Sequence, residues 1–173
     1  MKPPVDAVEL KPLFYWAGLA LFSCQQLEYG AKVLLVTLAD FGFCEFRLDE
    51  AIAIIEDEQK KTLGQVLRCI QQHVNFSDVL TAKLEAGLKS RNHFIHGFLT
   101  DSLERIADPA ARDGVIADLK AIRETVLAGD SAVRQILAAL SACHGLDLQK
   151  LKEHVEDELR ALNSLADVTR KSP

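Results

Sequence analysis

The sequence predicts an all-α protein, a bundle-like arrangement of about six or seven helices, and three observations support this prediction. The 96 residues from Leu13 to Asp108 contain no proline. The nine glycines are scattered singly, without the Asn-Gly or Gly-Gly pairs that mark tight β-hairpins. Apolar residues recur at spacings of three and four along most of the chain, which is the period of an amphipathic helix. A turn-rich all-β fold is therefore excluded.

Composition predicts one soluble domain that spans residues 1–173. The chain is 49% hydrophobic and 26% charged, which is enough for a sizeable core. Its formal net charge of −5 excludes a broadly basic surface, so RNA would have to bind at a local patch. The four cysteines form no CxxC pair, and Glu28 and Lys32 interrupt the apolar run that starts at Leu13. We expect a cytoplasmic protein that has no membrane partner.

The first helix is predicted from Pro12, which suits a first turn, to the Phe41-Gly42 step. Eight of the eleven aromatic residues lie within residues 14–46. We expect this aromatic cluster to pack in the core, and an interface between subunits is the alternative. The cluster consists of Phe14, Tyr15, Trp16, Phe22, Tyr29, Phe41, Phe43 and Phe46.

Two short helices are predicted next. Residues 48–58 carry apolar side chains at helical spacing and end on acidic residues. Thr62 can cap a second segment over residues 63–70, whose apolar positions also repeat at three and four.

Three longer helices complete the prediction. The first is capped by Ser77 or Asp78 and reaches Leu99, and a break is expected over residues 101–108. Pro109 suits the first turn of the second helix.

This second helix runs to about His144. Gly129 lies inside it, and the sequence leaves open whether the glycine bends or cuts the helix. Gly145 is typical of a helix end, and residues 148–165 then form a last amphipathic helix.

A polar stretch at residues 89–98 interrupts an otherwise amphipathic helix. It contains Arg91, Asn92, His93 and His96. At about 100° per residue, Asn92 and His96 lie about 40° apart on one face, whereas Arg91 lies about 140° from His96. Arg91 and His96 therefore flank a shared helix edge, and a second copy across a two-fold axis would place two such pairs together.

The stretch Arg91-Asn92-x-x-x-His96 resembles the Arg-x(4 to 6)-His signature of HEPN domains (higher eukaryotes and prokaryotes nucleotide-binding). Residues 62–65 (TLGQ) and 97–99 (GFL) are similar to one branch of small bacterial HEPN proteins, and the resemblance is strongest over residues 63–140. It implies an α-helical homodimer in which two motifs meet in a cleft. In many members of the family this arrangement forms a metal-independent endoribonuclease.

The roles implied by the resemblance fit the chemistry of these side chains. His96 can move protons near neutral pH and is the candidate general base or acid. Arg91 stays charged while the phosphorus centre gains negative charge, and Asn92 would hydrogen-bond phosphate or orient His96. Lys89 and His93 are candidate substrate-binding residues. Because RNA supplies its own 2′-hydroxyl as nucleophile, the scheme needs no metal and no cofactor.

Local charge is compatible with an RNA substrate. Residues 81–100 carry Lys83, Lys89 and Arg91 against Glu85 alone, within an acidic chain. This small patch favours a defined or structured RNA over indiscriminate binding. A protein antitoxin or another regulatory protein is a further expected partner. In the toxin branch, a tyrosine two residues after the histidine can be modified by the antitoxin, and Phe98 occupies that position here.

Three alternatives remain open at this stage. Arg91 and His96 can be plain surface or interface residues that satisfy nearby polar groups. His93 and His96, with Asp101, can hold a metal, although their spacing matches no recognisable site. The chain can also be a non-catalytic helical module that binds a nucleotide, an RNA or a protein.

Overall fold

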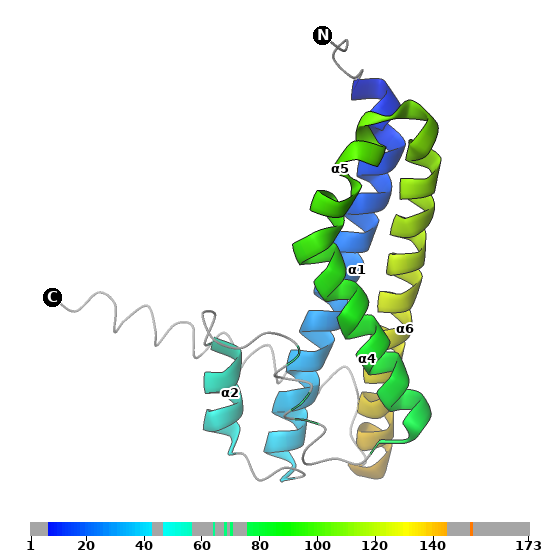
Figure 1. Cartoon of the computed structure of the whole chain (residues 1–173). Helices are drawn as coiled ribbons and strands as arrows, with labels where there is room; N and C mark the ends of the chain where they lie inside the picture. Colours follow the sequence, from blue (N-terminus) through cyan, green and yellow to red (C-terminus); the bar gives the residue numbers. More distant parts are fainter. Residues whose placement is uncertain are drawn as a thin grey trace, which may run out of the picture. The chain divides into compact units, whose positions relative to one another are not determined.

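The computed structural model describes residues 7–42, 47–56 and 76–144, together with the single positions 64, 68, 70 and 153. These residues are helical apart from short turns, and they contain no strand, which confirms the all-α class. Figure 1 shows the α-helices of the described residues. They are α1 (Ala7–Asp40), α2 (Leu48–Glu56), α4 (Asp78–His93), α5 (Leu99–Ala107) and α6 (Arg112–His144).

The chain divides into two compact units. The first unit contains residues Met1–Tyr29 and Ser77–Ala132, and the second contains Gly30–Phe76 and Val133–Pro173. Helices α1 and α6 each contribute one part to either unit. Every predicted site residue falls in the first unit.

In the first unit, α4 and α5 run antiparallel to both α1 and α6 (Figure 1). Apolar positions at helical spacing on each helix point inward and form the core. Trp16, Phe94 and Ile106 are partly buried against it. The buried core residues here are Leu13, Ala20, Phe98, Val115 and Leu119.

Two glycines allow α4 and α6 to approach closely. A Cβ atom on Gly87 would lie 3.1 Å from the Cα of Gly129, and one on Gly129 would lie 3.2 Å from the Cα of Gly87. The side chain of Leu27 from α1 fills the space beside both. Helix α6 continues without interruption through Gly129, so this glycine serves a helix crossing and does not cut the helix.

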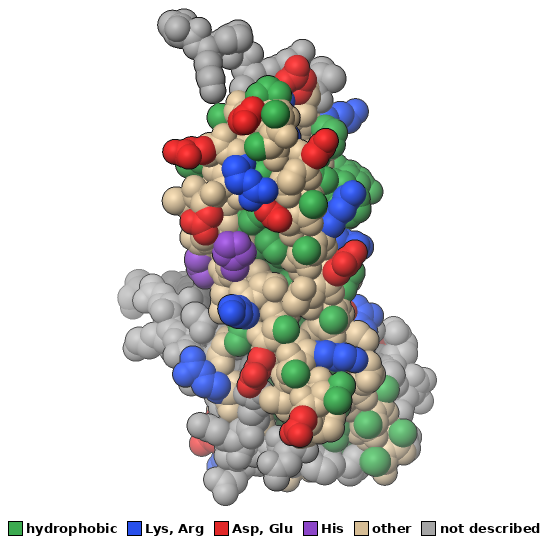
Figure 2. Space-filling model, turned by 45° about the vertical axis from the view of Figure 1, so that its right-hand side comes forward, with side chains coloured by type: hydrophobic (Ala, Val, Ile, Leu, Met, Phe, Trp, Pro, Cys, Tyr) green, Lys and Arg blue, Asp and Glu red, His purple; other side chains and the backbone are tan. Residues whose placement is uncertain are grey.

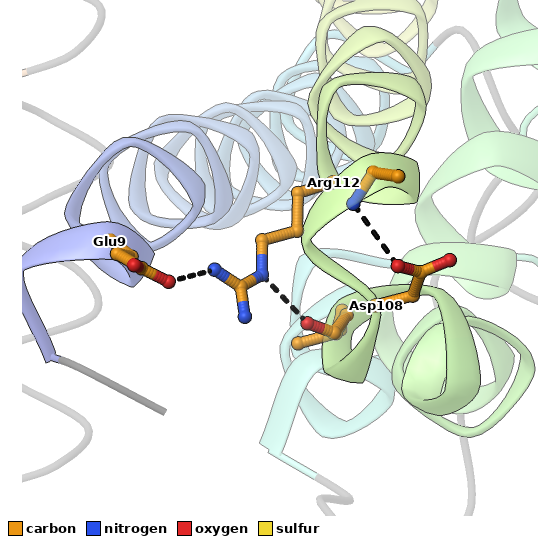
Figure 3. Close-up of polar contacts among 5 residues, drawn as sticks. Glu9, Asp108 and Arg112 are labelled. Carbon is orange, nitrogen blue, oxygen red and sulfur yellow. Dashed lines mark hydrogen bonds and ion pairs between the residues drawn. The ribbon is translucent and has the colours of Figure 1, made fainter. Parts of the chain in front are cut away.

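Arg112 ties the N-terminal end of α1 to the turn before α6 (Figure 3). Its buried guanidinium donates to Glu9 Oε2 over 2.7 Å and to the carbonyl of Ile106 over 3.0 Å.

Helix α1 starts at Ala7 and includes Pro12 in its interior, so the prediction that the helix begins at Pro12 is wrong. Pro12 is exposed, so the helix tolerates the missing hydrogen bond there.

The break expected over residues 101–108 is also wrong. Helix α5 continues to Ala107, because Ser102 and Ile106 pack inward between the charged residues. The helix ends at Asp108, whose carboxylate accepts from the backbone N–H of Ala110 (Figure 3). Pro109 then opens a short 3₁₀ turn, Pro109–Ala111, that leads into α6.

The second unit surrounds the C-terminal part of α1. All seven residues from Val33 to Ala39 are buried, so this part of the helix is covered on every side. The helix ends at Asp40, just before the predicted Phe41-Gly42 step, and Gly42 has a φ of +66° and donates its N–H to the carbonyl of Ala39. Ala51 and Ile52 bury one face of α2.

Other predicted elements lie partly or wholly outside the described residues. Residues 57–58 of the second predicted helix and most of residues 63–70 and 148–165 fall there, although Gly64, Arg68 and Glu153 are described as helical. Within the described part of the chain, the segment Pro109–Cys143 is long and apolar enough to cross a membrane by length and composition. Part of this segment is buried within the fold, and Val115 and Leu119 are among its fully buried residues.

Candidate functional site

Arg91 points inward, from α4 toward α1. Its Nη2 donates to Glu28 Oε2 over 2.8 Å, and its side chain is only 15% exposed, against 34% for the glutamate. These two residues are 63 positions apart in the sequence, so only the antiparallel packing of α1 and α4 brings them together. Because the pair is partly shielded from water, its attraction is stronger than that of an exposed ion pair.

Asn92 completes a polar cluster around the guanidinium. Its Oδ1 accepts from Arg91 Nη1 over 3.1 Å. The Arg91 Nε is buried and has no hydrogen-bond partner in the described structure. Two edges of the guanidinium are thus held by the protein, while one buried donor is left without an acceptor.

Cys24 lies next to this cluster on the buried face of α1. Burial raises the pKa of its thiol to about 11, the Arg91 guanidinium lowers it, and the Glu28 carboxylate raises it. The thiol is therefore protonated at neutral pH. Cys24 is only 2% exposed, so little water reaches this side of the Arg91–Glu28 pair.

A π-helical turn, Phe94–Phe98, follows directly after α4 and contains His96 and Gly97. Its hydrogen bonds join residues five apart instead of four, and such turns are frequent at functional sites. The turn changes the angular positions predicted for a regular helix. Phe98 is buried and packs against Phe94, which holds the turn against the core.

His93 and Asp101 face each other across the π-helical turn. His93 Nδ1 lies 3.9 Å from Asp101 Oδ2, and both side chains are well exposed. The imidazole of His93 also contacts the ring edge of Phe98, at a centroid separation of 6.0 Å. Gly97 lies beneath this pair, where a Cβ atom would contact both side chains at 3.4 Å.

His96 and Lys89 are exposed on the surface of the same segment. None of the hydrogen bonds or ion pairs among the described residues involves His96. The structure therefore brings Arg91 together with Asn92, and His93 together with Asp101. It does not bring Arg91 into contact with His96.

The charge around the histidines is mixed. Figure 2 shows histidine side chains gathered at one place on this face, with Lys or Arg and Asp or Glu side chains around them. Glu28 offsets the charge of Arg91, so the local patch is less positive than the sequence of residues 81–100 alone indicates. No group of three or more His, Cys, Asp or Glu side chains in the described residues is arranged to hold a metal ion.

Glu28 is the site residue that sequence reasoning missed. Residues 12–27 contain no charged side chain, and Glu28 is the first charged residue after them. This interruption of an uncharged run is the only feature of Glu28 that the sequence shows. A charge that follows so long an apolar stretch is a signal for a buried partner. The sequence gives no indication that this partner is Arg91.

Comparison of the chain with protein-family models, with curated proteins and with solved structures finds no match.

Proposed function

We propose that the protein is a HEPN-like, metal-independent endoribonuclease that cleaves RNA at a composite site in a homodimer cleft. The observation that supports this proposal is the held Arg91 guanidinium, fixed by Glu28 and Asn92 one helical turn before the exposed His96. A fixed cation and an exposed imidazole on one short segment are the two kinds of group that phosphate chemistry with an internal nucleophile requires.

In the proposed reaction the RNA 2′-oxygen forms a bond to phosphorus while the bond to the departing 5′-oxygen breaks. The products are a 2′,3′-cyclic phosphate and a 5′-hydroxyl. One proton leaves the 2′-oxygen and one reaches the 5′-oxygen, and the His96 side chains of the two subunits take these two roles. Arg91 stabilises the negative charge that builds on the phosphate oxygens, and Lys89 and His93 bind the neighbouring backbone.

The proposal is tested by incubating purified protein with structured RNA in the presence of a chelator. We expect cleavage products that carry cyclic phosphate ends, and we expect the His96→Ala and Arg91→Ala variants to lose at least about 100-fold in rate. Arg105→Ala is the matched control, because Arg105 lies on α5 and pairs only at the surface with Asp118. Absence of cleavage, or cleavage that survives both site substitutions, contradicts the proposal.

A second function is favoured by one specific observation. Arg91 is already neutralised by Glu28 and largely buried, which suits a structural cation better than a catalytic one. We propose as the alternative a non-catalytic helical module that binds a nucleotide, an RNA or a protein. RNA binding by the intact protein without any cleavage, unchanged by His96→Ala, would favour this alternative over the nuclease.

A further inference from the structure

Four residues follow one another at intervals of four across the π-helical turn, and they are Lys89, His93, Gly97 and Asp101. Residues four apart lie on the same side of a helix. A Cβ atom on Gly97 would lie 3.4 Å from both Asp101 Oδ2 and His93 Nδ1, so these two side chains meet over the glycine. We call these four residues the polar row.

Asp101 presents two acceptor oxygens that no donor in the described structure uses. Its side chain is 64% exposed, and its Oδ2 lies 3.9 Å from His93 Nδ1, which is too long for a hydrogen bond. None of the hydrogen bonds among the described residues involves this carboxylate. Arg105, four residues further on, is already paired with Asp118 over 2.6 Å. Both oxygens of Asp101 are therefore open to donors from a ligand.

Basic and acidic groups occupy opposite ends of the polar row. Lys89 is exposed and forms no ion pair among the described residues, and the side chain of His93 is 48% exposed. The proposed function uses Lys89 and His93 to bind the RNA backbone, whereas a carboxylate repels phosphate. Asp101 therefore suits an RNA site only if it accepts hydrogen bonds from another part of the RNA.

The donors of an RNA strand lie on its 2′-hydroxyls and on the edges of its bases. A 2′-hydroxyl supplies one donor and occurs in every nucleotide. A carboxylate with two free oxygens accepts best from two donor groups that lie side by side. On its Watson–Crick edge guanine presents such a pair, the N1–H and the N2 amino group, whereas adenine, cytosine and uracil each present one donor group. The chemistry of Asp101 therefore favours guanine.

We propose that Asp101 recognises a guanine base in single-stranded RNA, while Lys89 and His93 bind the backbone beside it. Contacts to the backbone position the strand, and the contact to the base edge supplies the specificity. His96 follows His93 by three residues, and Figure 2 shows the histidine side chains gathered on this face. The inference rests on the proposed function, which supplies RNA as the ligand, but the recognition of guanine requires no cleavage.

The experiment measures binding of the intact chain to fluorescent 2′-O-methyl RNA octamers, which lack the nucleophile and cannot be cleaved. Fluorescence anisotropy compares uracil octamers that carry guanine, hypoxanthine or adenine at one central position. We expect the guanine octamer to bind at least about 10-fold more tightly than the adenine octamer, because a bidentate contact discriminates against the wrong base. Hypoxanthine keeps the N1–H but lacks the amino group, so its octamer should lie between the two.

Asp101→Asn replaces one of the two acceptors by a donor at constant size, so it should abolish the preference for guanine. Asp113→Asn is the matched control. Asp113 is also an exposed aspartate without an ion pair among the described residues, but it lies on α6. Gly97→Leu fills the space over which His93 and Asp101 meet and should reduce the preference as well. Circular dichroism checks that every variant remains helical.

Three outcomes overturn the inference. The first is guanine and adenine octamers that bind equally or not at all. The second is a preference that Asp101→Asn and Asp113→Asn affect equally. The third is competition by free GMP as strong as that by unlabelled guanine octamer, which would make a free nucleotide the ligand.

Failure of the proposed function gives a different result. A preference for guanine that depends on Asp101, without cleavage of unmodified RNA, contradicts the nuclease and supports the recognition of guanine. Cleavage of RNA that does not depend on guanine does the opposite.

Discussion

The two parts of α1 are both strongly apolar, but their surroundings are opposite. In the second unit, the seven residues from Val33 to Ala39 are all buried and mostly aliphatic. In the first unit, the aromatic side chains of Phe14, Tyr15 and Phe22 are exposed. Helix α1 therefore exposes one of its faces in the first unit and is buried on every face in the second unit.

This difference shows that hydrophobic content alone does not decide whether a side chain is buried within its own chain. The aliphatic segment is covered by its own chain. The aromatic segment has one face in the core, where Leu13 and Ala20 are buried, and exposes Phe14, Tyr15 and Phe22 on the other. The prediction that the aromatic cluster packs in the core is therefore wrong for Phe14, Tyr15, Phe22 and Tyr29, and the alternative of a subunit interface stays a prediction. Phe43 and Phe46 lie outside the described residues.

The largest effect is expected from shortening a leucine in each part of α1. Leu34 is fully buried, so Leu34→Ala should lower the free energy of unfolding by about 2 to 5 kcal/mol. Leu21 is 43% exposed, and Leu21→Ala should cost about 0.5 kcal/mol or less. Urea unfolding of the two variants measures both free energies. Equal costs would mean that Leu21 is covered within its own chain.

A smaller effect distinguishes a glycine at a helix crossing from one on the open face of α1. Gly87→Ala should destabilise the fold by about 1 to 3 kcal/mol, because its Cβ atom would press on the backbone of Gly129. Gly18→Ala has open space and should stabilise the monomer by about 0.5 to 1 kcal/mol, since alanine favours a helix. Thermal unfolding of the two variants should move in opposite directions, and a loss of stability in both would refute the crossing.

The N-terminal end of α1 should respond to the loss of a single contact. Glu9→Ala removes an acceptor from the buried Arg112 guanidinium and should cost about 1 kcal/mol. Glu9→Gln keeps an oxygen there and serves as the control. Hydrogen exchange should become faster at residues 7–12 and stay unchanged at residues 33–39, because the two parts of α1 belong to different units. Faster exchange along the whole helix would contradict this separation.

The smallest effect concerns reactivity at neutral pH. Cys24 is buried and its thiol has a pKa of about 11, so iodoacetamide should leave it unmodified while it labels the exposed Cys143. Because folding raises this pKa, the thiol should destabilise the fold only as the pH rises from about 9 toward 11, where the unfolded chain loses its proton first. Peptide mass spectrometry measures the labelling, and equal modification of both cysteines would show that water reaches this face of α1.

Much of the fold could be predicted because helical periodicity is a local property. The end of α1 just before Gly42, the cap at Ser77 and the turn at Pro109 all follow from single residues with known preferences. The start of α1 could not be predicted this way. Arg112 holds the turn that precedes Pro12, and a contact between residues 103 positions apart leaves no local signal.

The candidate site shows the same limit. The sequence identified Arg91, Asn92 and His96 as a group but placed them on a regular helix. The π-helical turn after His93 changes that geometry, and the choice of this turn depends on how Phe94 and Phe98 pack in the core. Glu28 escaped notice because its pairing with Arg91 depends on the docking of two distant helices.

The π-helical turn also has a meaning for insertions and deletions. Five residues, Phe94–Phe98, occupy a stretch that a regular helix would fill with one residue fewer. A chain that lost Gly97 could close this stretch into an ordinary α-helix and still keep Arg91 and Ser102 on their present faces. The additional residue therefore sets where His96 lies on the surface, and deletion of Gly97 should move His96 to another face of the helix.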